Sequence, residues 1–342
     1  MQRPSEGEQM TTTASTIRNA IPNDSRSIAL LFELAYGQSS HPCKQAEHVR
    51  DSICSGSTAW RVAIERDKVV ACITLLINVW NHSWELARAV TLPEYRGLGL
   101  GTELMQCSVD DACASSSCDV ILGFPRSRTM LNIVSGLKPS MMAVGHDGAI
   151  NVANDAREYH AITYATNPAA RFPHYIPETP SLADTEFVRN EIFNVLGLRP
   201  ERRKYPSQWV VGDGIAHPDL KPFSFAYDPL CPSNAIEITG YNAESTDAHH
   251  VAHQLTSMLN SFHHTRHTRL IVPVDKTELI MKLAPVGFEV TAYLPAWYLH
   301  DGGRYDCVLL VRRGFSEEPV DHGIREIVDR FRQGLTGRAT GL

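Results

Sequence analysis

The chain has 342 residues, of which 43% are hydrophobic and 20% charged, and its net charge is −6. This composition is typical of a globular protein, and the length is sufficient for two domains. The acidic balance argues against a general nucleic-acid surface, and no apolar run approaches the ~20 residues that span a bilayer. We therefore expect neither a nucleic-acid partner nor a membrane partner.

The N-terminal residues and the cysteines indicate the compartment. Residues 1–14 lack the apolar stretch of a signal peptide and are expected to form a disordered tail. The 8 cysteines are scattered without any C-x-x-C pair, which fits neither a zinc site nor a disulfide scaffold. We therefore expect reduced thiols in a cytoplasmic protein.

The first half of the chain alternates between strand and helix patterns in the order β-α-α-β-β-β-α-β-α-β. The expected strands are 15–23, 60–65, 69–80, 85–91 and 119–124, with a closing hairpin formed by 149–152 and 159–164. The expected helices are 28–36, 45–53, 102–114 and 129–136.

A glycine-rich turn, R-G-L-G-L-G at residues 96–101, separates strand 85–91 from helix 102–114. Three glycines at alternate positions leave the backbone without Cβ atoms, so a large group can come close. The unpaired amides and the macrodipole at the start of the helix favour an anion. The sequence therefore predicts a phosphate-binding turn.

Two common phosphate motifs do not fit this turn. A dinucleotide site needs G-x-G-x-x-G, and a nucleotide P-loop needs a lysine where this chain has Gly101-Thr102-Glu103. The remaining pattern, Arg96-x-x-Gly99-x-Gly101, resembles the pyrophosphate-binding motif of the Gcn5-related N-acetyltransferase (GNAT) superfamily, whose members bind acetyl-coenzyme A. A glycine-rich turn without a ligand is the alternative. The order of elements is also that of the acyltransferase fold.

The resemblance implies an α/β (α+β) fold with a mixed central sheet flanked by helices, and acetyl-CoA or another acyl-CoA as co-substrate. Main-chain groups of strand 85–91 would bind the pantetheine arm, and amides of the turn would hold the pyrophosphate. Arg96 would support the turn or a phosphate. The residues implied for the pantetheine arm and for the pyrophosphate are Ala89, Val90, Thr91, Gly97, Leu98, Gly99, Leu100, Gly101 and Thr102.

The second half begins after a proline-rich segment, 167–181, which is expected to be a stiff, extended linker. Helices are expected at 182–196, 248–262 and 277–284, and strands at 208–211, 235–239, 269–274 and 305–311. This half has no glycine-rich strand-to-helix turn.

The whole chain resembles a two-lobed GNAT subgroup in which a degenerate acyltransferase-like domain follows the active one. The residues that carry this resemblance are Ile176-Pro177, L-G-L-R at Leu196–Arg199, G-F-E-V-T-A-Y-L-P at Gly287–Pro295 and Y-D-C-V-L-L at Tyr305–Leu310. The expected organisation is a tail at 1–14, a catalytic domain at 15–166, a linker at 167–181, a degenerate lobe at 182–314 and a C-terminal helix or tail at 315–342.

Acyl transfer to an amine needs a proton acceptor, and relatives often use a glutamate on the strand before the turn. The resemblance implicates Glu85, with His82 beside it, as catalytic residues; an exposed strand-end carboxylate is the alternative. Relatives often protonate the leaving thiolate with a tyrosine on a helix that corresponds here to 129–136, which contains none. Either the thiolate leaves unassisted, or Tyr159, Tyr164 or a residue of the second lobe donates the proton.

Two histidine clusters have the pattern H-H-x-x-H, but neither has the glutamate of H-E-x-x-H or an obvious third ligand. We expect polar, solvated surface and no metal. A basic loop is expected to be solvated or to receive an acidic partner. These residues are His249, His250, His253, His263, His264 and His267 in the clusters, and Arg199, Arg202, Arg203 and Lys204 in the loop.

The function expected from these features is transfer of an acyl group, most simply acetyl, from a coenzyme A thioester to the amine of a small molecule. One alternative donor is the phosphopantetheine thioester of an acyl carrier protein, which would dock at the basic loop. An alternative of another class is a non-catalytic acyl-CoA-binding regulatory module, which the missing tyrosine favours.

Overall fold

A computed structural model describes residues 15–37, 41–153, 156–211, 225–230, 234–241, 247–262 and 264–336. The chain forms two compact units, the first comprising Met1–Leu75 and Arg88–Leu104 and the second Leu76–Ala87 and Met105–Leu342. These units do not divide at the expected linker, 167–181. Three elements contribute residues to both units: β3 (Lys68–Asn78), β4 (Ser83–Thr91) and α3 (Leu100–Ala114).

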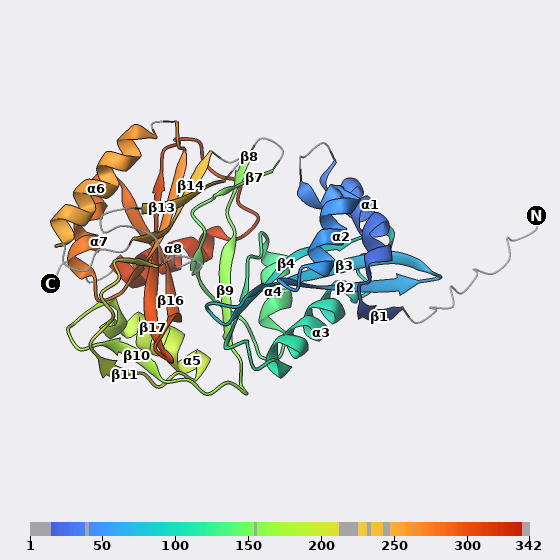
Figure 1. Cartoon of the computed structure of the whole chain (residues 1–342), viewed down its shortest axis with the longest axis horizontal. Coiled ribbons are helices and arrows are strands. Elements are labelled where there is room, and N and C mark those ends of the chain that lie inside the picture. Colours follow the sequence, from blue (N-terminus) through green and yellow to red (C-terminus); the bar gives the residue numbers. More distant parts are fainter. Residues whose placement is uncertain are drawn as a thin grey trace, which may run out of the picture. The chain divides into compact units, whose positions relative to one another are not determined.

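The first unit packs two helices against strands β2 and β3 (Figure 1). Its further elements are β1 (Thr16–Asn19), which pairs antiparallel with β2 (Thr58–Glu65), and helices α1 (Ser25–Tyr36) and α2 (Ala46–Cys54). The apolar positions of α1 recur at three- and four-residue spacing, so one face is buried against the strands. Fully buried core residues include Ile28, Phe32, Val49, Val62 and Val70.

The second unit contains a mixed sheet with neighbours in the order β4-β5-β9-β6-β16-β17-β15, extended by β12, β14 and β13. β4 pairs parallel with β5 and β14 parallel with β15, whereas β5–β9, β6–β9 and β16–β17 are antiparallel. The strands are β5 (Val120–Gly123), β6 (Met142–His146), β9 (Ala161–Thr166), β12 (Val210–Val211), β13 (Phe225–Leu230), β14 (Ala235–Tyr241), β15 (His267–Pro273), β16 (Phe288–His300) and β17 (Gly303–Arg313).

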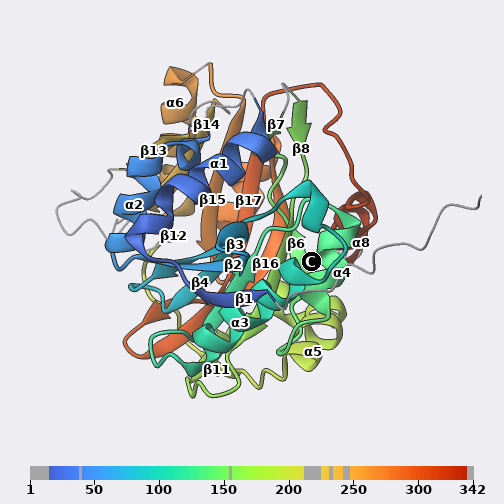
Figure 2. The same ribbon diagram turned by 90° about the vertical axis from the view of Figure 1, so that its right-hand side faces the viewer.

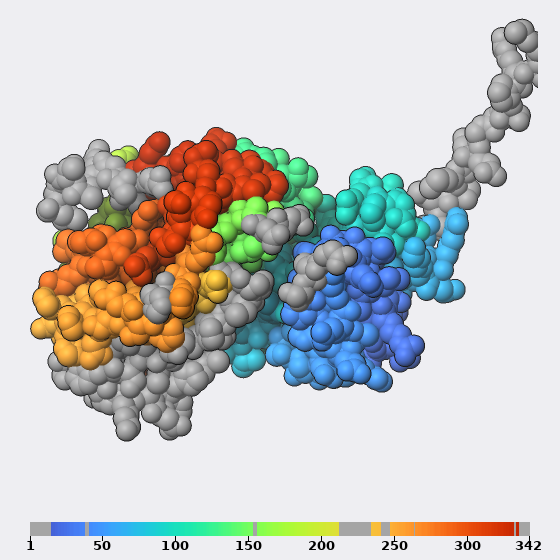
Figure 3. All heavy atoms as spheres, turned by 90° about the horizontal axis from the view of Figure 1, so that it is seen from above, coloured from blue at the N-terminus to red at the C-terminus, as the bar shows by residue number. Residues whose placement is uncertain are grey.

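The main helices of the second unit are α4 (Arg128–Ser135), α6 (Ala248–Ser261), α7 (Thr277–Leu283) and α8 (Arg325–Thr336). Helix α8 packs on β6 and β16, and its surface is visible in red in Figure 3. It buries Ile327, Val328 and Phe331. Arg128 of α4 donates to Glu326 of α8 at 3.1 Å, and the two helices lie side by side in Figure 2.

The expected order of elements in the first half is confirmed, and the α/β class with a mixed sheet flanked by helices is confirmed with it. The closing hairpin of 149–152 with 159–164 is wrong. The sixth strand of that order is β6, which pairs with β9, whereas β7 (Asn151–Ala153) and β8 (Ala156–Glu158) form a separate two-stranded hairpin. β6 was not predicted because its short sequence around Gly145 shows little alternation of apolar and polar residues. Its pairing with β9 makes it a strand.

The proline-rich segment is not only a linker, because it contains strand β10 (His174–Pro177). β10 pairs parallel with both β11 (Glu201–Arg203) and β17. Its prolines lie just before the strand and at its last residue, where a missing N–H costs the ladder little. Proline content therefore concealed a strand here.

The expected helix 182–196 begins as a separate 3₁₀ turn (Leu182–Asp184), and the continuous helix that follows is π-helical at Val188–Phe193 and ends with α5 (Asn194–Leu196). Gly197, with φ 67°, ends it in the left-handed conformation. Residues 1–14, expected to be a disordered tail, and 337–342 lie outside the described residues. Within the described ranges, no helix is long and apolar enough to cross a membrane.

His267, the first residue of β15, has no exposed surface, and burial together with the charge of Arg269 lowers its pKa to about 3. The neutral ring donates from Nε2 to the Asp147 carbonyl at 3.2 Å. Because the unfolded chain binds this proton near pH 6.5 and the folded chain does not, stability falls as pH drops from about 6.5 towards 3.

We predict that His267→Asn reduces the pH dependence of the free energy of unfolding by up to ~1.4 kcal/mol per pH unit in this window. Urea denaturation at a series of pH values measures it. The matched control is His249→Asn, because His249 is exposed on α6. Equal slopes for the parent and the His267→Asn variant would contradict the assignment.

Candidate functional site

The glycine turn lies between β4 and α3, after a 3₁₀ turn at Pro93–Tyr95. Gly97 has φ 79° and Gly99 has φ 83°, values that side-chain-bearing residues rarely adopt. A Cβ atom built on either glycine meets nothing within 4 Å, so the backbone is open to its surroundings there. Gly101 differs: its φ is not positive, and its Cβ would make an ordinary 3.7 Å contact with Thr91.

The first turn of α3 presents backbone amides beside these glycines. The Glu103 amide donates to the Gly99 carbonyl at 3.0 Å, which makes Gly99 the residue that precedes the helix. The amides of Leu100, Gly101 and Thr102 consequently have no acceptor within the helix. With the positive end of the macrodipole, they form an environment that stabilises an anion.

Arg96 begins the turn and is exposed, and its Nε donates to the Thr91 carbonyl at 3.4 Å. Before the turn, Ala89 is exposed, Val90 is buried, and Thr91 is half-buried. All the residues expected to hold the donor thioester, 89–91 and 96–102, thus belong to the first compact unit. Arg96 and Leu98 (56% exposed) extend the turn into solvent.

The two expected catalytic residues belong to the second unit. Glu85 is half-buried on β4, where it pairs with Leu122 of the parallel strand β5. His82 lies in the turn before β4, with φ 47° and a side chain that is 40% exposed. Its Nδ1 lies 3.5 Å from an oxygen of Asp119.

A fully buried arginine, Arg304 of β17, holds the turn that contains His82. Its guanidinium donates to Asp119 Oδ2 at 2.9 Å, to the Ala296 carbonyl at 2.8 Å and to the Asn81 carbonyl at 2.5 Å. A buried charge is tolerated when it is paired and hydrogen-bonded in this way. Asp119 therefore contacts both Arg304 and His82.

The tyrosines considered as proton donors have other partners. Tyr164 is fully buried and donates its hydroxyl to the Pro295 carbonyl, and burial raises its pKa far above the ordinary value. The Tyr159 hydroxyl accepts from Arg313 at 2.9 Å. Tyr164 is thereby unsuited to protonating a leaving thiolate.

Sequence reasoning missed Arg88, which has φ 55° within β4, an uncommon value for a residue other than glycine. Its guanidinium lies 5.9 Å from the ring centroid of Trp60, within cation–π range. Burial, with the charge of Arg88, lowers the pKa of His41 to about 4. The His41 ring stacks on Phe32 and Tyr36. The sequence of this strand has no glycine at position 88, so nothing in it predicts the positive φ of Arg88.

The histidine clusters do not converge in the described part of the chain, where no group of three or more potential metal ligands occurs. The cluster on α6 (249, 250 and 253) is exposed, as is His264, whereas His267 is buried; His263 lies outside the described residues. The basic loop is not simply solvated. Arg202 pairs with Asp184, and the Arg203 guanidinium lies 4.7 Å from the Tyr175 ring centroid.

In a comparison with known protein families, the matching part of the chain includes the glycine turn. Residues 28–123 match the model of the acetyltransferase (GNAT) family. No curated protein matches the chain significantly.

Similar solved structures cover a little under half of this chain. The ribosomal-protein-S5-alanine acetyltransferase from Vibrio fischeri is 16% identical with a TM-score of 0.40, over 46% of this chain and 99% of that one. A spermidine N-acetyltransferase from Vibrio cholerae is 17% identical with a TM-score of 0.39, over 45% and 94%. An N-acetyltransferase from Staphylococcus aureus is 14% identical with a TM-score of 0.40, over 45% and 99%.

The matched segment contains β4, the glycine turn, α3 and β5, which are the elements that build the candidate anion site. The part of the chain that resembles the acetyltransferase (GNAT) family is therefore the part that contains the glycine turn.

Proposed function

We propose that the protein transfers an acyl group, most simply acetyl, from a coenzyme A thioester to the amine of a small molecule. The observation that carries this proposal is the conformation of the glycine turn. Positive φ at Gly97 and Gly99, open space at their Cβ positions and the amides at the start of α3 together fit a diphosphate. The GNAT family uses acyl-CoA as its donor.

In the proposed reaction, the amine nitrogen attacks the thioester carbonyl carbon, the C–N bond forms and the C–S bond breaks. Coenzyme A departs as a thiolate, which takes up through solvent the proton that the nitrogen loses after attack, and the ammonium proton of the free amine must leave before attack. An amine with a pKa of ~10.4 is only about 0.04% neutral at pH 7, so a general base is worth roughly 10²–10⁴ in rate. We assign this role to Glu85, with His82 as the alternative base.

The thiolate leaves without a tyrosine proton in this proposal. A thiol with a pKa of ~8.5 is a good enough leaving group for that route. This route is supported by Tyr164, whose hydroxyl already donates to the Pro295 carbonyl.

We predict that Gly99→Val reduces the affinity for coenzyme A by at least about tenfold, because the side chain would fill the space that the diphosphate needs. Calorimetric titration of coenzyme A measures the change. Gly56→Val is the matched control, since Gly56 also has a positive φ (70°), also has nothing within 4 Å of its Cβ, and lies outside the turn. Equal affinities of the two folded variants would refute the assignment of the turn.

We predict that Glu85→Gln retains coenzyme A affinity but lowers the rate of amine-dependent thiol release by ~10²-fold at neutral pH. Part of the loss should return at high pH, where the amine deprotonates without help. The assay measures free thiol from acetyl-CoA with a panel of small amines, for parent and variant, between about pH 6 and 10.

A parent that binds coenzyme A but releases no thiol with any amine would indicate a binding module instead of an enzyme. If the Glu85→Gln profile has the height and shape of the parent profile, the base lies elsewhere, and His82→Gln is the next variant to measure.

A further inference from the structure

Arg88 lies on β4 directly before Ala89–Thr91, the residues proposed to bind the pantetheine arm of the donor. Arg88, this segment and the glycine turn all belong to the first unit. In the proposed function, the pyrophosphate lies at residues 97–102 and the arm follows β4 back towards Ala89. The thioester end of the donor would therefore reach the strand near Arg88.

The guanidinium of Arg88 has a defined position. The backbone φ of Arg88 is 55°, a value that residues other than glycine seldom adopt and that often marks a functional site. The guanidinium lies 5.9 Å from the ring centroid of Trp60 on β2, within cation–π range. The Trp60 ring is fixed in turn, since its Nε1 donates to Ser52 Oγ at 3.0 Å. Both the backbone and the ring thus restrict where this charge can lie.

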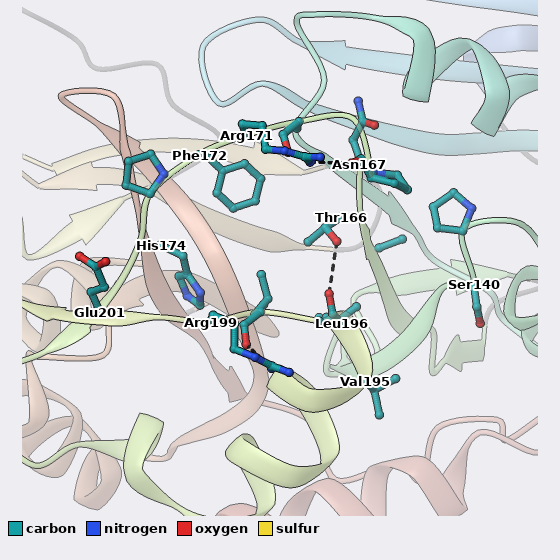
Figure 4. A pocket seen from close by; sticks show the side chains of 17 residues that line it. Ser140, Thr166, Asn167, Arg171, Phe172, His174, Val195, Leu196, Arg199 and Glu201 are labelled. Atoms are coloured by element: carbon teal, nitrogen blue, oxygen red, sulfur yellow. Dashed lines mark hydrogen bonds between the residues drawn. The ribbon is translucent and has the colours of Figure 1, made fainter.

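The Arg88 guanidinium has no hydrogen-bond acceptor and no carboxylate partner among the residues that the structure describes. By contrast, Arg171 and Arg199, which line a cavity beside His174 in the second unit (Figure 4), both donate to backbone carbonyls. Arg88 is half-buried, so its charge is partly removed from water without being paired. An anionic ligand would supply the missing partner.

The groups around Arg88 that shift the pKa of a neighbouring histidine are all basic. Burial, with the charges of Arg88, His48 and Lys44, lowers the pKa of His41 to about 4. His48 also has a buried ring nitrogen, Nε2, without a hydrogen-bond partner. A half-buried guanidinium among basic groups favours the approach of an anion.

A carboxylate matches a single guanidinium, because the planar fork of N–H donors forms two parallel hydrogen bonds with its two oxygens. The proposed reaction also requires an amine close to the thioester, and hence close to Arg88. An amino acid carries an amine and a carboxylate close together. It therefore provides both groups that this end of the donor site calls for.

We propose that the acyl acceptor is an amino acid whose carboxylate binds the Arg88 guanidinium. This inference rests on the proposed function, because it names the class of amine that receives the acyl group.

The experiment uses acetylated products, which bind without reacting. Calorimetry measures the affinity of the full chain, with and without saturating coenzyme A, for N-acetyl-L-phenylalanine and for N-acetylphenethylamine, which lacks only the carboxylate. N-acetylglycine and N-methylacetamide form a second pair without a side chain. In at least one pair the acid should bind more tightly by roughly tenfold or more. It should also shift the ¹⁵N signal of Arg88 Nε.

Equal affinities within both pairs, or no saturable binding of either acid, would overturn the proposal. A chain that does not bind coenzyme A would instead contradict the proposed function. The titrations without coenzyme A then still show whether Arg88 binds a carboxylate.

Variants of Arg88 assign the preference to its side chain. Arg88→Gln should reduce the difference within the pair to about twofold or less, whereas Arg88→Lys, which keeps the charge but not the fork, should retain part of it. Arg26→Gln removes an exposed arginine of α1 and is the matched control, which should bind like the parent. A cooperative thermal unfolding transition shows that each variant is folded. An undiminished preference for the acid in folded Arg88→Gln would refute the assignment.

Discussion

The candidate active site depends on a backbone constraint: Gly97 and Gly99 both adopt positive φ, at 79° and 83°. This conformation turns the chain from β4 into α3 and exposes the amides at the start of the helix. Residues with a side chain rarely adopt it, and at glycine no side chain obstructs the approach of an anion. In the proposed function, donor recognition is therefore a property of the main chain, and Arg96 adds a positive charge at the edge of the turn.

A second constraint acts on the residues that precede β4. Buried Arg304 binds the Asn81 carbonyl and Asp119, and Asp119 lies beside His82. The start of β4, which carries Glu85, thus follows a turn whose position is fixed by a strand from the far end of the sequence. In the proposed mechanism, the C-terminal half contributes by positioning the proton acceptor. It also holds a separate charged cavity at His174.

Local features were predictable from the sequence, and long-range ones were not. The glycine spacing predicted the turn, and periodicity predicted the order of the first nine elements, because both signals lie within short windows. Strand β10 was missed because its partners, β11 and β17, lie about 25 and 130 residues away. Arg304–Asp119 and His174–Asp306 likewise join positions that no local pattern connects, and Arg88 adopts positive φ without a glycine to signal it.

Hydrogen–deuterium exchange, with and without acetyl-CoA, tests whether the backbone amides of the glycine turn bind the donor. Amides that bind a diphosphate exchange more slowly. We predict that acetyl-CoA slows exchange most strongly at residues 97–102, with no comparable protection in residues 182–314. Protection confined to the C-terminal half, or none at the glycine turn under saturating acetyl-CoA, would contradict it.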